Sequence, residues 1–351
     1  MGVPRLVLAL GALLQQPQLA HPDSSASASH QQQQAAGTAP LLSSVFFSVG
    51  YGPCLDFSVE DWRTELRLLS AINVSSIILK NVVHGDSDTN SSAAFATAAY
   101  PSTLPWVARQ AGVDVLGKLL TACDLHGGFE VHVGIFEDAA FFHGHKTVDW
   151  LGVYSARNVA VMQEVTARYR SRHRSFHSIY DSAEVNDRDW LPPTDDRLIT
   201  HYLQPVHGWA HKAGLRTSTA PFFFNSSKPS NSAQFWDRLF ARVKIDRVWL
   251  DDDAATSFWT IEGPIPFYRA FGPVAEKHGV EVWSDCVDHG HDDHSQPIAH
   301  FVAQLRAEAP FVQGFTTFEW LRHMSPGKGA YNGSAQFYYD YLAYFRNTTE
   351  R

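Results

Sequence analysis

The sequence predicts an α/β fold, a (β/α)8 TIM barrel that forms a single domain with loop insertions. Short β-rich segments alternate with segments of helical periodicity from Leu41 almost to the C-terminus. Such alternation predicts βαβ units and a parallel sheet, and eight units fit the usual length of a barrel with insertions. A doubly wound open sheet is the alternative, but no Gly-x-Gly-x-x-Gly motif follows the first predicted strand.

The predicted strands are short runs rich in β-branched and aromatic residues. They cover residues 44–49, 75–80, 129–136, 175–184, 215–224, 246–253, 280–286 and 312–318. Apolar residues recur at helical spacing between them. The first helix follows Ser58, a predicted N-cap with Asp61 three residues later. The other helices cover residues 113–125, 153–172, 196–212, 232–241, 267–278, 298–308 and 335–345. Residues 81–105 are predicted to form a long polar loop.

The composition limits the classes of function. The 351 residues carry a formal net charge of -8 and no basic run, which argues against a nucleic-acid partner. Aromatic residues make up 13% of the chain, with 10 Trp, and they suit both a large core and a cleft that stacks on sugar rings. After the N-terminal segment, no run approaches the ~18 apolar residues that a membrane span needs.

Residues 1–20 have the pattern of a secretory signal peptide, which predicts a secreted or lumenal protein. Arg5 supplies the basic region, residues 6–14 the apolar core and Ala20 a small residue at a cleavage point, although Gln18 is larger than usual at its position. Residues 21–40 are rich in Ser, Ala and Gln and are predicted to be a disordered linker. The barrel domain then covers residues 41–351.

Asn-x-Ser/Thr motifs agree with that compartment, because they accept N-glycans in secreted proteins. They occur at Asn73, Asn90, Asn225, Asn332 and Asn347. Three cysteines, Cys54, Cys123 and Cys286, allow at most one intramolecular disulfide. Cys54 and Cys286 both follow predicted strands and are candidates to pair, while three unpaired thiols are an equal alternative.

Acidic residues gather at the ends of several predicted strands, where a parallel barrel carries its chemistry. Glu184 ends the fourth strand. The others are Glu137 and Asp138 after the third strand, Asp251, Asp252 and Asp253 on the sixth, Asp285 and Asp288 on the seventh, and Glu319 after the eighth. Adjacent carboxylates repel one another unless they are solvated, protonated or bound to cations. Some of them are therefore expected to cap helices or to bind loop amides.

Paired carboxylates are the groups that glycoside hydrolysis needs. One carboxylic acid donates a proton to the leaving oxygen, while the other carboxylate attacks or activates water. Aromatic residues near the strand ends are candidates for contacts with sugar rings, or else for the core: Tyr180, Trp249, Trp283 and Trp320.

Other chemistries compete with this hypothesis. Residues 289–294 (His-Gly-His-Asp-Asp-His) are dense in potential metal ligands, and residues 142–145 are a weaker example. No His-Glu-x-x-His motif is present, and such loops are more often simply exposed. No Gly-x-Ser-x-Gly motif supports a serine nucleophile. Cysteine catalysis would have to pair Cys286 with His289, which an oxidising compartment disfavours.

Over residues 43–346 the chain resembles the TIM-barrel, glycoside-hydrolase-like family catalogued as domain of unknown function 4434. The similar segments are residues 62–78, 128–136, 175–184, 246–252, Trp283 and residues 315–326. Residues 62–78 correspond to the family's first helix and second strand, and residues 128–136 to its Gly-x-x-Val-x-x-Gly third strand. Residues 175–184 correspond to its fourth strand, which ends in Glu184, and residues 246–252 to its sixth, with an acidic residue at Asp252. Trp283 and residues 315–326 correspond to its last two strands.

Two positions differ from the family pattern. The sixth strand carries Asp-Asp-Asp at 251–253 in place of Gln-Asp-Gly, and the seventh strand offers Asp285 and Asp288 where the family has a Glu. A shorter Asp in place of that Glu would widen the gap between the carboxylates or end activity. The resemblance implies a barrel and, by analogy of fold and site, carbohydrate hydrolysis.

These inferences predict a secreted glycoside hydrolase that acts on an extracellular or cell-wall polysaccharide, with no cofactor and no metal. Glu184 is the predicted general acid. Its partner carboxylate is Asp252 first, followed by Asp285 and Glu319. Predicted substrate contacts lie at or near strand ends: Tyr51, Lys80, Tyr180, Asp251, Trp283 and Trp320.

Two alternatives remain open at the level of sequence. A carbohydrate-binding barrel that has lost turnover would explain the departures on the sixth and seventh strands. A metal-dependent hydrolase would instead use the histidines of residues 289–294.

Overall fold

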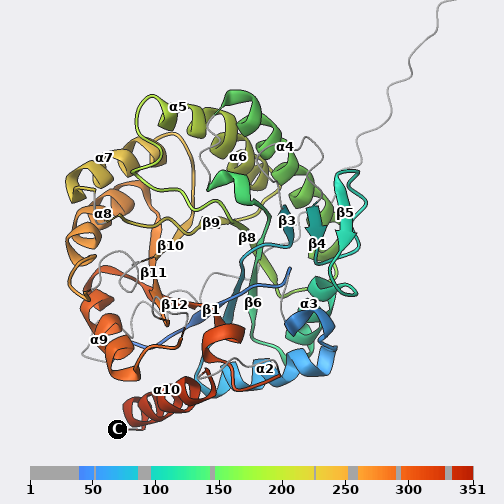
Figure 1. The fold of residues 1–351 in the computed structure, drawn as a ribbon, viewed down its shortest axis with the longest axis vertical. Coiled ribbons are helices and arrows are strands. Elements are labelled where there is room, and N and C mark those ends of the chain that lie inside the picture. The colour runs from blue at the N-terminus through green and yellow to red at the C-terminus, as the bar shows by residue number, and fades with distance from the viewer. Residues whose placement is uncertain are drawn as a thin grey trace, which may run out of the picture. The chain divides into compact units, whose positions relative to one another are not determined.

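A closed parallel barrel forms the centre of the structure (Figure 1). The computed structural model describes residues 39–50, 53–85, 96–142, 147–224, 227–251, 260–289, 294–328 and 334–350. Eight strands pair in the order β1-β2-β6-β8-β9-β10-β11-β12, and each neighbouring pair is parallel. The backbone N–H of Ser43 donates to the carbonyl oxygen of Phe315 at 3.1 Å and so joins the last strand to the first. The predicted (β/α)8 barrel is confirmed.

All of the barrel strands except β11 are shorter than the sequence predicts. They are β1 (Ser44–Phe47), β2 (Ser76–Leu79), β6 (Glu130–Gly134), β8 (Phe176–Asp181), β9 (Thr217–Thr219), β10 (Arg247–Asp251), β11 (Glu281–Val287) and β12 (Gly314–Phe318). The fourth barrel strand, β8, ends at Asp181, so Glu184 lies in the loop beyond it and not on the strand. This corrects the prediction that the strand itself extends to Glu184.

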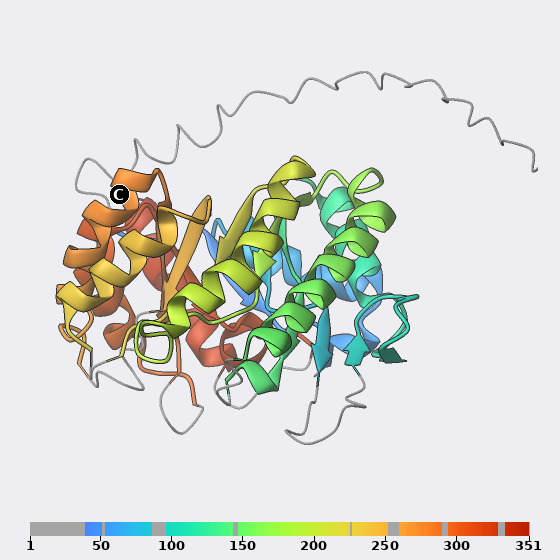
Figure 2. The ribbon, with the colours of Figure 1, turned by 90° about the horizontal axis from the view of Figure 1, so that it is seen from above.

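Helices surround the barrel strands on the outside (Figures 1 and 2). They are α2 (Val59–Ala71), α3 (Val115–His126), α4 (Val148–Val165), α5 (Thr194–Leu198), α6 (Gln204–Lys212), α7 (Pro229–Phe240), α8 (Ile265–His278), α9 (Ile298–Glu308) and α10 (Ser334–Thr349). Helix α2 begins as predicted, because Ser58 and Asp61 form a reciprocal capping box. Of the helices in the described ranges, none is both long enough and apolar enough to cross a membrane.

A second, smaller sheet lies partly where the sequence predicts only a polar loop. Its strands are β3 (Val83–Gly85), β4 (Ala96–Ala98), β5 (Val107–Gln110) and β7 (Phe136–Asp138), in the order β5-β4-β3-β7. Strands of three or four residues are too short to show a periodic pattern, so the sequence does not indicate them. The pairing of β3 with β7 places His84 opposite Glu137.

The apolar core has two layers. The larger layer packs between the strands and the helices, while a smaller cluster fills the barrel interior with Phe46, Ile78, Tyr180, Ala220 and Trp249. Successive side chains on a strand point to opposite faces. Residues two positions beyond these interior side chains therefore face inward again, nearer to the C-terminal ends of the strands. Asp251 lies two residues after Trp249 on β10 and therefore faces the interior near the C-terminal end of the barrel, where the interior becomes polar.

Candidate active site

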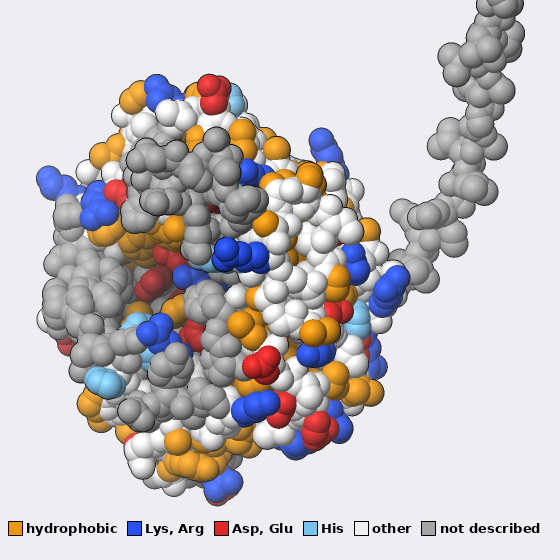
Figure 3. All heavy atoms as spheres, turned by 45° about the vertical axis from the view of Figure 1, so that its right-hand side comes forward, with side chains coloured by type: hydrophobic (Ala, Val, Ile, Leu, Met, Phe, Trp, Pro, Cys, Tyr) orange, Lys and Arg blue, Asp and Glu red, His pale blue; other side chains and the backbone are white. Residues whose placement is uncertain are grey.

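A cleft opens at the C-terminal ends of the barrel strands, where the sequence predicts the acidic residues. It has a volume of about 220 Å³. It is lined by Phe46, Lys80, Tyr180, Glu184, Ala220, Asp251, Asp285, Val287, His289 and Phe318. Lys80, Tyr180, Glu184, Asp251 and Asp285, all predicted site residues, therefore face one cavity. Figure 3 shows acidic, basic and histidine side chains gathered in a hollow of the surface.

Lys80, just beyond β2, lies between two carboxylates. Its Nζ is 3.7 Å from Oε1 of Glu184 and 3.8 Å from Oε2 of Glu137. Glu137 also accepts a hydrogen bond from Nδ2 of Asn81 at 3.0 Å, and Nδ1 of His84 lies 3.8 Å from its Oε1. The side chain of Glu137 is 8% exposed and that of Glu184 33%. Glu184 is thus the carboxylate that a ligand in the cleft can reach, and Glu137 is the buried partner that holds Lys80.

Two hydrogen bonds, one from the loop after β8 and one at the end of β8 itself, hold Glu184 at the cleft. Ser182 donates a hydrogen bond to the carbonyl oxygen of Lys80. On the outer face, the carboxylate of Asp181 accepts a hydrogen bond from the hydroxyl of Tyr202 at 2.6 Å. This loop is therefore tied both to the end of β2 and to the helical layer, and Glu184 is positioned without lying on a strand.

Asp251 and Asp285 form a second acidic pair on neighbouring strands. They are partners in the parallel register of β10 and β11. Such partners project to the same side, and neighbouring strands lie ~4.8 Å apart. The backbone N–H of Asp251 donates to the carbonyl oxygen of Pro221 at 2.9 Å, which ties the end of β10 to the chain beyond β9. Two neighbouring carboxylates can share one proton, an arrangement by which a site supplies both an acid and a base.

Tyr180 lies on β8 and closes the floor of the cleft. Burial raises the pKa of its hydroxyl well above the usual value, and the nearby acidic residues, Glu184 first, act in the same direction. The hydroxyl is therefore protonated at neutral pH and can donate a hydrogen bond to a ligand. Together with Phe46 and Phe318, Tyr180 gives the cleft an aromatic surface.

Glu319, a predicted alternative partner for Glu184, lies behind the cleft. It is 6% exposed and, among the described residues, it is not part of the lining. Its Oε2 accepts a hydrogen bond from the hydroxyl of Ser48. Burial raises the pKa of Glu319, although the Ser48 hydrogen bond and the charge of Lys80 oppose that shift. We therefore regard Glu319 as a supporting residue of the cleft wall.

Trp320, a predicted substrate contact, belongs to the core. The π-helical turn η7 (Trp320–Met324) begins directly after Glu319 and directs the indole toward the outer helices. Trp320 is fully buried, and its Nε1 donates to Oε2 of Glu65 on α2 at 2.8 Å. Trp320 is therefore a packing residue and not a substrate contact.

Trp283, another predicted substrate contact, lies deeper in the barrel than the cleft. Its ring makes an edge contact with Trp249, with centroids 5.2 Å apart, and the guanidinium of Arg247 lies 4.3 Å from the Trp283 ring centroid. Arg247 is the first residue of β10 and so lies at the end of the barrel opposite to the cleft. The tryptophans of β10 and β11 thus fill the barrel interior, and Trp283 is not among the described residues that line the cleft.

The three cysteines are buried, and the structure joins no two of them by a disulfide. Of the two alternatives that the sequence leaves open, the structure therefore favours three thiols over a Cys54–Cys286 bridge. Cys54 donates to the carbonyl oxygen of Ser48 at 3.3 Å, and burial raises its pKa to about 12. A thiol with so high a pKa is a weak nucleophile at neutral pH, so Cys54 serves packing.

Some predictions fall outside the described residues. They are the signal peptide at 1–20, most of the linker at 21–40, the substrate contact Tyr51 and the first-choice partner carboxylate Asp252. In the histidine-rich segment, residues 290–293 are likewise outside. Conversely, the structure assigns a role to Glu137, which the sequence only places after the third strand. The sequence feature that could have indicated a polar environment for Glu137 is the pair of polar residues Asn81 and His84 after the second predicted strand.

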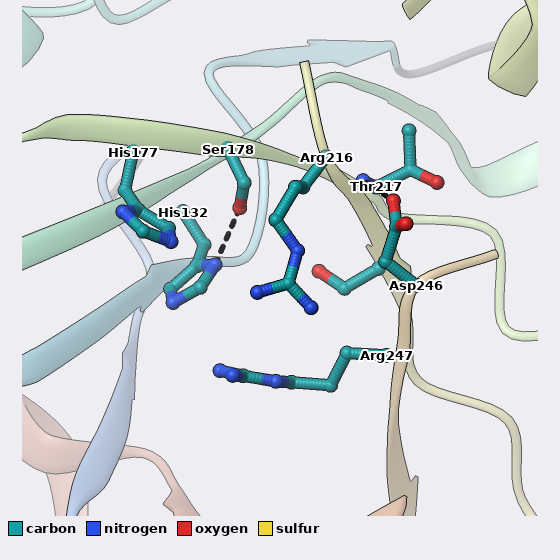
Figure 4. Close-up of a pocket in the computed structure, with 8 residues that line it drawn as sticks. His132, His177, Ser178, Arg216, Thr217, Asp246 and Arg247 are labelled. Atoms are coloured by element: carbon teal, nitrogen blue, oxygen red, sulfur yellow. Dashed lines mark hydrogen bonds between the residues drawn. The ribbon is translucent and has the colours of Figure 1, made fainter. Parts of the chain in front are cut away.

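The opposite end of the barrel is closed by polar side chains (Figure 4). A cavity of about 10 Å³ there is lined by His132, His177, Ser178, Arg216, Thr217, Ser218, Asp246 and Arg247. Burial lowers the pKa of His132 well below its usual value, so its imidazole is neutral and bonds to the hydroxyls of Ser178 and Ser76. This end of a TIM barrel generally serves stability and not chemistry. The cleft at the C-terminal ends is therefore the candidate active site.

A parallel eight-stranded barrel with carboxylates converging at its C-terminal end has the fold of the glycoside-hydrolase-like TIM barrels. The chain belongs to the family described as "Domain of unknown function (DUF4434)", whose family model matches residues 52–330. No curated protein sequence matches the chain.

Solved structures with the same fold include glycoside hydrolases. The chain is similar to a protein provisionally assigned as an alpha-L-fucosidase from Bacteroides thetaiotaomicron, with 16% identity, a TM-score of 0.69, and coverage of 88% of this chain and 96% of that one. It is also similar to a GH18 chitinase from Pseudoalteromonas aurantia, with 10% identity, a TM-score of 0.50, and coverage of 87% and 98%. At these identities the likeness establishes the fold alone.

Proposed function

We propose that this protein is a secreted glycoside hydrolase that cleaves glycosidic bonds of an extracellular or cell-wall polysaccharide, with Glu184 and Asp285 as its paired carboxylates. The observation that carries the proposal is that Glu184, Asp251 and Asp285 line one cleft at the C-terminal ends of the barrel strands. Catalytic groups of TIM-barrel enzymes lie at this end, and glycoside hydrolysis requires two carboxylates on either side of the scissile bond.

Glu184 is the general acid in this proposal. It is the more exposed of the two carboxylates that contact Lys80, and the ammonium of Lys80 is shared with the buried Glu137. In its protonated form, Glu184 can donate a hydrogen bond to a glycosidic oxygen bound in the cleft. Glu184 gives this proton to the leaving oxygen as the bond from that oxygen to the anomeric carbon breaks.

Asp285 is the second carboxylate. It is 5% exposed and is held on β11, so it approaches the substrate from the floor of the cleft. It attacks the anomeric carbon, or takes a proton from a water that does so. Asp251, in register with Asp285, is then placed to bind sugar hydroxyls or to share the proton of its neighbour. The mechanism needs no cofactor.

The sequence supports action outside the cell. Residues 1–20 have the pattern of a signal peptide. Two of the Asn-x-Ser/Thr asparagines lie within the described residues, Asn73 and Asn347, and both are exposed, as glycan acceptors must be. Asn90, Asn225 and Asn332 lie outside them.

A screen for sugar release tests the proposal. The purified protein is incubated with a panel of polysaccharides and aryl glycosides, and the products are measured as reducing ends or free phenol. We expect turnover of at least one substrate class, and a loss of about 100-fold or more in Glu184→Gln. Glu276→Gln, which changes an exposed glutamate on α8, is the matched control and should retain full activity. Binding without turnover by the wild-type protein would instead identify a carbohydrate-binding barrel.

A further inference from the structure

Three potential metal ligands from two separate segments meet beside the cleft. Asp288 and His289 directly follow β11, and His323 lies in the helical turn η7 after β12. One ligand atom of each of the three residues lies within 4.8 Å of the others. Along the sequence His289 stands next to the histidines of residues 289–294, whereas the fold brings it to His323, more than thirty residues further along the chain.

The geometry of the cluster suits a small cation. Oδ1 of Asp288 and Nδ1 of His289 are 3.3 Å apart, and two ligands about 2 Å from a tetrahedral ion lie roughly 3.3 Å apart. The imidazoles of His289 and His323 are nearly parallel, with centroids 4.2 Å apart. The His323 imidazole thus lies beside that of His289, and its ligand atom is within 4.8 Å of those of the other two residues.

The burial of Asp288 and His323 also favours a bound cation. Asp288 is fully buried, and its second oxygen, Oδ2, has no hydrogen-bond partner among the described residues. His323 is 2% exposed. A buried carboxylate with an unsatisfied oxygen is costly, and binding to a cation is one of the few ways to offset that cost.

The ligand types select the class of ion. Two imidazoles with one carboxylate suit zinc and its neighbours in the transition series, whereas calcium and magnesium prefer oxygen ligands alone. Three protein ligands leave a coordination position open, as in catalytic and exchangeable zinc sites. His289 also lines the cleft, so an ion held here would lie at the cleft wall.

We propose that Asp288, His289 and His323 bind one divalent transition-metal ion, of which zinc is the best fit. The ion connects the end of β11 to η7, the turn that starts directly after Glu319. It therefore stabilises the wall of the cleft. This proposal does not rest on the proposed glycosidase chemistry, because that chemistry uses Glu184 and Asp285 and needs no metal.

Direct metal binding tests the proposal. The full chain, without a histidine tag and stripped with a chelator, is titrated with Co²⁺ while its visible absorption is recorded, and with Zn²⁺ in competition. We expect one ion per chain and no comparable binding of Mg²⁺ or Ca²⁺. The variants His323→Ala and His289→Ala should each weaken binding by about 100-fold or more, whereas His300→Ala on α9 should bind as the wild type does.

Thermal unfolding supplies a second readout. Zinc should raise the Tm of the wild-type protein and of His300→Ala but not that of His289→Ala, because only binding to the folded state stabilises it. Circular dichroism checks that the variants are folded. His289 is partly exposed, so its variant remains informative if the buried His323→Ala variant fails to fold. Stoichiometric binding that survives in folded His289→Ala, or the absence of binding in the wild-type protein, would overturn the proposal.

Discussion

At the scale of single residues, Lys80 is the side chain on which the charges of the cleft depend. It contacts Glu137 and Glu184 and is itself 19% exposed at the side chain. Lys80→Met leaves the buried Glu137 without its ammonium partner. We expect the free energy of unfolding to fall by about 1–3 kcal/mol, measured by urea unfolding, and turnover of any substrate to fall with it.

A double variant isolates this interaction. Glu137→Gln removes the carboxylate that Lys80→Met leaves unpaired. The double variant should therefore lose less free energy of unfolding than the two single variants lose together. If the costs simply add, Lys80 and Glu137 are not coupled and the described role of Lys80 is wrong.

Some site residues can be predicted from the sequence, and others cannot. That Glu184 and Asp285 face the cleft can be predicted, because they lie at or just after the C-terminal ends of barrel strands. Trp320 cannot, because its direction depends on the turn η7 and on its bond to Glu65, which is far away in the sequence. Trp283 shares a strand face with Asp285, but its depth in the barrel depends on the register between β11 and its neighbours.

At the scale of elements, the contact between β2 and β6 sets the position of Lys80. Gly134 ends β6, and a Cβ added there would lie 2.0 Å from the carbonyl oxygen of Leu79 and 2.5 Å from that of Lys80. Gly134→Ala should therefore lower the free energy of unfolding by about 1–3 kcal/mol, and turnover by about 10–100-fold through displacement of Lys80.

The matched control is Gly152→Ala on α4, where an added Cβ meets no atom within 4 Å. It should leave activity unchanged and stabilise the helix by about 0.5–1 kcal/mol. Equal stability and activity in Gly134→Ala and the wild-type protein would show that the two strands can separate without consequence for the cleft.

Glu65 links α2 to the segment after β12. Its Oε2 accepts hydrogen bonds from Nε1 of Trp320 at 2.8 Å and from Oγ of Ser325 at 2.6 Å. Burial raises the pKa of Glu65 above its usual value of 4.5, although these hydrogen bonds oppose the shift. The folded protein therefore holds this proton more tightly than the unfolded chain does.

This raised pKa predicts the pH dependence of stability. Protonated Glu65 contributes to the free energy of unfolding. This contribution is fully present below the pKa of Glu65 in the unfolded chain, about 4.5, and is lost as the pH rises through its pKa in the folded protein. Glu65→Gln cannot titrate. The stability of the wild-type protein relative to Glu65→Gln, from urea unfolding at several pH values, should fall from pH 4 upward. A relative stability that grows with pH would contradict the assigned cause.

At the scale of the whole molecule, the last helix holds the segment that leads into the first strand of the barrel. The buried backbone N–H of Leu42 donates to the hydroxyl of Tyr341 on α10 at 2.7 Å, and the hydroxyl of Tyr344 donates to the carbonyl oxygen of Pro40 at 2.9 Å. Tyr341→Phe leaves a buried N–H without a partner. We expect it to lower the free energy of unfolding by about 1–3 kcal/mol.

Tyr339→Phe provides the control, because Tyr339 lies on the same helix and is 56% exposed. Its urea midpoint should match that of the wild-type protein. If Tyr341→Phe also unfolds at the wild-type midpoint, the closure of the barrel does not depend on this hydrogen bond.

The overall fold follows from the sequence more readily than the site does. Eight β-rich segments alternate with amphipathic ones, and each local pattern agrees with the same parallel barrel. The sheet of β3, β4, β5 and β7 does not follow, because its strands are too short to carry a pattern. It is this sheet that brings His84 to Glu137, so part of the charge network of the cleft depends on the least predictable element.

The pairing of Glu184 with Asp285 is tested most directly by kinetics with two leaving groups. A glycoside with a phenolate leaving group needs little protonation, whereas the natural sugar leaving group needs a general acid. Glu184→Gln should lose about 10²–10⁴-fold on the natural bond but stay within about tenfold of the wild type on the activated one, and Asp285→Asn should lose activity on both. Equal losses on both substrates in Glu184→Gln, or full activity in Asp285→Asn, would contradict the pairing.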